Sequence, residues 1–86
     1  MSKIEITKEI EMLIADKKNA EKRIRELNKA REIVADNLNP HANDACVHID
    51  FIIEEWKRVI EIATAEIAKD KKKLKLMEHL EALDNE

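Results

Sequence analysis

The sequence predicts an all-α protein in which two long helices fold back on each other as an antiparallel, coiled-coil-like hairpin. Three observations lead there: the composition lacks glycine and 41% of its residues are charged, two long apolar patterns have helical spacing, and the single proline lies between them. Chains rich in Ala, Leu, Ile, Glu and Lys favour long helices over sheets with tight turns. We expect residues 1–86 to form one domain with a thin core.

The first predicted helix spans residues 3–37. Ser2 followed three residues later by Glu5 is the pattern of a capping box, which opens a helix. Behind it lies a seam of ten positions, spaced by four and three residues, of which eight are apolar. We expect the two polar ones, Lys17 and Arg31, to set the register by pairing with carboxylates of the second helix. The seam consists of Ile6, Ile10, Leu13, Lys17, Ala20, Ile24, Leu27, Arg31, Val34 and Leu38.

Asn39 and Pro40 end the first helix and open the second. A residue before proline is kept out of the α region, asparagine is a good N-cap, and proline is favoured at the start of a helix. We therefore place the turn at residues 38–40 and the second helix at residues 41–83. The charged run at 69–73 contains no helix breaker, so this helix should continue through it and fray at its end. The competing interpretation is a kink or a separate short last helix near 69–73. The second seam consists of Ile49, Ile53, Trp56, Ile60, Ala63, Ile67, Leu74 and Met77.

The distribution of charge favours the antiparallel arrangement independently. With the turn near residue 40, residue i should lie near residue 82 − i. The acidic segment 1–16 then faces the lysine-rich segment 67–75, and the basic segment 17–31 faces the acidic segment 50–66. Exposed ion pairs add little stability, so this match selects the orientation more than it stabilises the fold.

The second helix is apolar on more than one face, which predicts self-association. Two helices bury only one stripe each, so the remaining apolar side chains need another chain to cover them. The simplest cover is a second copy, which gives a homodimer built as a four-helix bundle. The competing interpretation is that Phe51 and Ile62 are scattered surface residues. The expected interface comprises Val47, Phe51, Ile52, Trp56 (the main core anchor), Val59, Ile62 and Ala65.

The start of the second helix holds one candidate metal site. His41, Asp44 and His48 fall on one helical face, with a spacing of four between the last two that can chelate zinc or nickel. The competing interpretation is cap chemistry, in which Asp44 favours the helix dipole and the histidines are solvated. We interpret Cys46 as a small core residue, because no oxyanion hole or orienting third group accompanies it.

The first helix carries four cations at spacings of four, three and four on the side away from its seam. Such a basic ridge can hold the phosphates of a nucleotide or of a nucleic acid. No aromatic side chain is interleaved to stack on a base, and Glu21 and Glu26 flank the cations, so a solvated helix face is the competing interpretation. The ridge consists of Lys18, Lys22, Arg25 and Lys29.

Several functional classes are disfavoured by composition. A chain without glycine has no glycine-rich phosphate loop, a single cysteine forms no internal disulfide, and no apolar run is long enough to span a bilayer. We therefore expect a cytoplasmic, non-enzymatic protein without a cofactor. The short, acidic, glycine-poor composition is similar to that of small helical hairpins encoded by phages and other mobile elements.

The function expected from these features is binding of another protein, as an oligomeric adaptor, inhibitor or assembly factor. Two alternatives use the basic ridge instead. The chain would then be a helical oligomer that sequesters a nucleotide or other phosphate-bearing ligand, or a nucleic-acid accessory protein. Binding through the ridge should weaken steeply with ionic strength, whereas apolar association should not.

Overall fold

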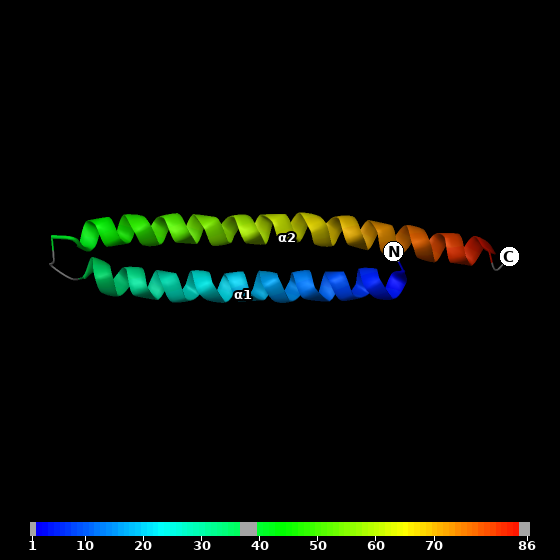
Figure 1. Cartoon of the computed structure of the whole chain (residues 1–86), viewed down its shortest axis with the longest axis horizontal. Helices are drawn as coiled ribbons and strands as arrows, with labels where there is room; N and C mark the ends of the chain where they lie inside the picture. The colour runs from blue at the N-terminus through cyan, green and yellow to red at the C-terminus, as the bar shows by residue number, and fades with distance from the viewer. Residues whose placement is uncertain (1, 37–39, 85–86) are drawn as a thin grey trace.

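The computed structural model describes residues 2–36 and 40–84, and two long helices make up its architecture (Figure 1). Helix α1 spans Lys3–Ala35 and helix α2 spans Ala42–Asp84. They pack against each other in opposite directions, in a rod measuring 72 × 14 × 13 Å. The predicted all-α hairpin is confirmed, and neither described helix carries a stretch apolar and long enough to cross a membrane.

The two ends of α1 follow from local chemistry. Ser2 is extended, and its hydroxyl oxygen accepts a hydrogen bond from the backbone N–H of Glu5 at 3.2 Å, as the N-cap of a capping box does. The helix ends at Ala35, and the N–H of Asp36 still donates to the carbonyl of Glu32 at 3.1 Å. The predicted end at residue 37, the last seam position and the predicted asparagine cap lie outside the described residues.

Helix α2 begins one residue later than the predicted residue 41. Pro40 and His41 lie in a turn, and the carbonyl of His41 accepts a bond from the N–H of Ala45 at 3.1 Å. Asp44 lies in the first turn, where a carboxylate favours the helix dipole. The helix continues unbroken through residues 69–73, as the absence of a helix breaker predicts.

The two predicted seams form the contact between the helices. The apolar seam residues that are not fully buried are half-buried in the described chain, so each helix covers one stripe and the core is thin. Trp56 is among these half-buried residues, while Ile53, one turn before it, is 6% exposed. The buried apolar side chains among the described residues are Ile6, Ile10, Ala20, Cys46, Ile53 and Ala63.

Two ion pairs between the helices match the predicted antiparallel register. The Arg31 guanidinium donates to both carboxylate oxygens of Asp50, at 2.6 and 3.2 Å. Near the other end, the Lys3 ammonium lies 3.0 Å from a carboxylate oxygen of Glu81. The rule that residue i faces residue 82 − i places residue 51 opposite Arg31 and residue 79 opposite Lys3, so each observed partner is at most two positions away.

The two cations of the α1 seam behave differently. The hydrogen bonds from Arg31 to Asp50, and then the charge of that carboxylate, raise the pKa of the guanidinium above its ordinary value. Arg31 thus pairs with a carboxylate of the second helix, as predicted. Lys17 is half-buried and makes no ion pair with any described residue, so the structure gives it no such partner.

Replacing a buried seam residue should destabilise the hairpin in proportion to the volume removed. Ile53→Ala is expected to cost about 2–5 kcal/mol, because it removes a buried side chain and leaves a cavity between the helices. Ile53→Val, which removes one methylene, should cost about 0.5–1.5 kcal/mol. Urea unfolding at one fixed protein concentration measures both values. Equal values for the two variants would contradict burial of this side chain.

Candidate functional site

Helix α2 exposes a row of apolar side chains outside the seam that packs against α1. Val47, Phe51 and Ile62 are 63%, 64% and 65% exposed. With Ala65, also exposed, they fall within about 60° of one another at 100° per residue. We call Val47, Phe51, Ile62 and Ala65 the outer stripe. Its side chains face water in the hairpin, which contributes no second element to cover them.

The apolar surface continues from the outer stripe toward α1. Ile52 is half-buried and Val59 is 37% exposed, and both lie between the outer stripe and the seam. Val59 and Ile62 also line a shallow hollow between the two helices, together with Leu13, Asp16 and Ala63 of the facing surfaces. The half-buried Trp56 occupies the seam, so part of its indole contributes to the contact within the hairpin.

Three further leucines extend the outer stripe along the last turns of α2. Helix α2 has 43 residues against 33 in α1, and its end projects past the N-terminal end of α1 (Figure 1). Leu76 lines a hollow together with Ile6 of α1, and Leu80 and Leu83 follow it toward the end of α2; the three are 59%, 52% and 52% exposed. Their spacing of four and three could have been recognised in the sequence, because it places them on the same sector of the helix as Phe51 and Ile62.

The basic ridge of α1 is exposed along its whole length. Lys18, Lys22, Arg25 and Lys29 are all exposed, and none forms an ion pair with a described residue. Glu26 beside the ridge pairs instead with Arg23, at 3.3 Å. The four ridge cations therefore have no carboxylate partner within the described hairpin.

The predicted histidine site lies on an exposed part of the hairpin, at the start of α2. His41, Asp44 and His48 are each exposed, and their ligand atoms form no compact group in the described chain, so metal binding there stays a prediction. Cys46 is 8% exposed, and its Sγ lies 4.0 Å from the carbonyl oxygen of Arg31. This placement fits a small core residue.

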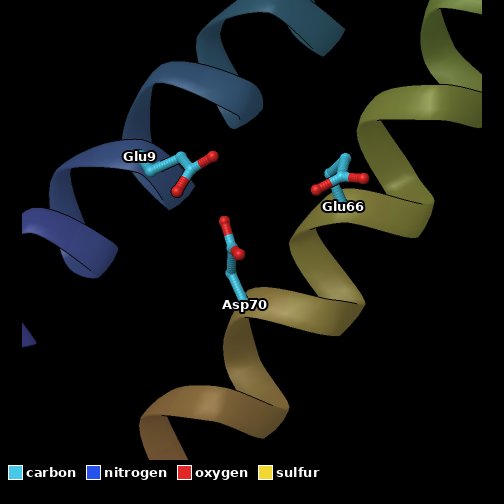
Figure 2. A group of neighbouring side chains, drawn as sticks. All are labelled: Glu9, Glu66 and Asp70. Carbon is cyan, nitrogen blue, oxygen red and sulfur yellow. The ribbon is translucent and has the colours of Figure 1, made fainter. Parts of the chain in front are cut away.

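A cluster of three carboxylates is the feature that the sequence reasoning missed. Glu9 of α1 and Glu66 and Asp70 of α2 are the single group of three metal-ligand side chains found in residues 2–36 and 40–84 (Figure 2). Asp70 is 2% exposed. The sequence contained the necessary pattern. The spacing of three and four residues between Ile67 and Leu74 places residue 70 in the seam, where it is predicted to face α1.

Comparisons of the chain with protein-family models, with curated proteins and with solved structures found no match. Functional proposals for it therefore rest on the geometry described above.

Proposed function

We propose that the protein is a self-associating helical hairpin that works without catalysis, by binding another protein as an adaptor, inhibitor or assembly factor. The outer stripe is the observation that carries this proposal. Three large apolar side chains about two-thirds exposed, on one sector of one helix, favour an interaction surface over scattered surface residues.

The free energy of burying the exposed apolar side chains supports a dimer in which folding and association are one event. Burying a Phe, Ile or Val side chain contributes about 1.5–3 kcal/mol. A symmetric dimer buries each stripe residue twice, so the outer stripe and Val59 contribute on the order of 10 kcal/mol before the costs of association. A lone two-helix hairpin is marginal, because each helix buries a single stripe. The dimer would supply most of the stability.

A second copy fits the outer stripe because the stripe is complementary to itself in the antiparallel direction. If residue i of one α2 lies near residue 127 − i of the other, Val47 meets Leu80, Phe51 meets Leu76, and Ile62 meets Ala65. The two-fold axis then passes between Ile62 and Ala65, as an isologous interface requires. Each α2 would lie between its own α1 and the partner's α2, in a four-helix assembly.

Charged residues that interrupt the outer stripe fit the same register. Glu54 and Glu55 of one copy face Lys72 and Lys73 of the other, and the same contact repeats across the two-fold axis. Two like-charge pairs oppose this register: Arg58 faces Lys69, and Glu61 faces Glu66. Opposite charges beside an apolar stripe fix direction and register more than they raise affinity. The apolar pattern of the outer stripe and the two Glu–Lys contacts together favour this antiparallel register.

The second candidate function is binding of a phosphate-bearing ligand, either a nucleotide or a nucleic acid, through the basic ridge. Four exposed cations without carboxylate partners favour it. The double change Lys22→Glu with Arg25→Glu should abolish such binding and leave the dimer intact, because the ridge lies on α1 and the outer stripe on α2. Phosphate contacts should also weaken steeply with salt.

Native mass spectrometry of the protein purified from its own host cell tests the proposed function. Two copies with a co-purifying protein, retained at high salt, are the expected result. A retained small anion or oligonucleotide, absent from the Lys22→Glu with Arg25→Glu variant, would establish the second candidate instead. A single copy with nothing bound would contradict both.

A further inference from the structure

Carboxylates from both helices converge at one place beside the contact between α1 and α2. Glu9, Glu66 and Asp70 each offer one oxygen, and the three oxygens all lie within 4.8 Å of one another. Glu66 and Asp70 are one turn apart on α2, and Glu9 approaches from α1. Figure 2 shows the Asp70 carboxylate directed into the space between the two glutamates.

The Asp70 side chain lacks the partner that its burial demands. It is 2% exposed, and its Oδ2 atom is buried without a hydrogen bond from any described residue. Buried polar atoms in folded proteins are satisfied almost without exception, and a buried carboxylate without a partner is strongly unfavourable. The two nearest carboxylates add negative charge rather than donors. A bound cation would both satisfy this oxygen and offset the negative charge of the three carboxylates.

We propose that Glu9, Glu66 and Asp70 bind a divalent cation of the hard, oxygen-preferring class, such as Mn²⁺, Ca²⁺ or Mg²⁺. The donor set consists of carboxylate oxygens alone, which selects these ions over zinc or copper. Oxygens at about 2.0–2.6 Å from an ion lie at most about 5 Å apart, which matches the observed spacing.

The burial of the three ligands suits a cation that keeps bound water. Asp70 is buried, whereas Glu9 and Glu66 are half-buried, so the cluster opens to solvent on one side. Water can complete the coordination there, as is usual for Mg²⁺ and common for Ca²⁺. Because the ligands come from both helices, the bound ion would join α1 to α2 and neutralise Asp70.

Titration of the metal-free, full-length protein with Mn²⁺ alone tests this site. Electron paramagnetic resonance should show loss of the free Mn²⁺ signal at about one ion per chain, and saturating Mn²⁺ should raise the melting temperature by at least about 5 °C. Asp70→Asn should abolish both effects, and it should melt above the metal-free wild type because it removes the unpartnered charge. Glu61→Gln, an exposed α2 carboxylate outside the cluster, should behave as wild type.

Further variants keep the test decisive if Asp70→Asn fails to fold. Glu9→Gln and Glu66→Gln should each weaken Mn²⁺ binding at least about tenfold, the loss seen even for groups outside the ligand shell. His41→Ala with His48→Ala should leave Mn²⁺ binding unchanged, which separates this site from the histidine site. A wild-type melting temperature that does not change with Mn²⁺ would overturn the proposal. So would Mn²⁺ binding by Asp70→Asn or Glu9→Gln as tight as that of the wild type.

Discussion

The double change Phe51→Glu with Ile62→Glu is expected to turn the protein into a largely unfolded monomer. Both side chains are about two-thirds exposed in the hairpin, so their replacement removes few contacts within one chain. In the proposed dimer each is buried twice, and two carboxylates per chain would enter an apolar contact without partners. Far-ultraviolet circular dichroism should show loss of most helical signal, and sedimentation velocity should show the mass of one chain.

The matched control places the same chemical change elsewhere on the surface. Ile4 and Ile33 of α1 are 70% and 73% exposed, and both lie off the outer stripe. Ile4→Glu with Ile33→Glu should therefore keep the helical signal and the mass of the wild type. If the two double variants behave alike, or if the Phe51 and Ile62 variant remains a folded dimer, the outer stripe is not the interface.

Exchanging the charges beside the outer stripe should convert the homodimer into an obligate heterodimer. One chain carries Glu54→Lys with Glu55→Lys, and the other carries Lys72→Glu with Lys73→Glu. In the proposed register a homodimer of either variant would place like charges opposite each other. This repulsion should weaken self-association of each variant by at least about tenfold. When the two variants are mixed, all four positions of one chain would face opposite charges on the other. Native mass spectrometry should then detect mainly the mixed dimer.

This exchange tests register and direction separately from apolar burial. A chain with all four changes restores opposite charges in the homodimer, so it should associate like the wild type. The change at Glu54 also removes its ion pair with Lys57, at 3.1 Å, but an exposed pair at this spacing contributes little. Statistical mixing of the two chains would contradict the antiparallel register of 127 − i.

The hairpin could be predicted well from the sequence because the spacing of the apolar residues and the distribution of charge favour the same antiparallel arrangement. The seam of α1 could be predicted from residue spacing alone. The same spacing, with the antiparallel register, predicted that Arg31 faces a carboxylate near residue 51, and it pairs with Asp50. Lys17 shows the limit of that reasoning. A half-buried lysine can pack its flexible four-carbon stem against apolar neighbours and keep its ammonium in water, so a seam position does not oblige it to pair.

The candidate sites were harder to predict because charged residues were interpreted as surface. Asp70 sits among lysines, so its seam position was passed over although the spacing required it. Leu76, Leu80 and Leu83 were left out of the predicted interface, although their spacing places them on the same sector of α2 as Phe51 and Ile62. Ligand geometry between Glu9 and Asp70 depends on the packing of two helices, which no local pattern encodes.

Sedimentation equilibrium of the wild-type protein at micromolar concentration tests self-association most directly. The predicted result is a helical species of twice the 10.0 kDa of one chain, with a melting temperature that rises with protein concentration. High salt should leave that mass unchanged, because the outer stripe is apolar. A folded species with the mass of one chain, melting at the same temperature at every concentration, would contradict the dimer.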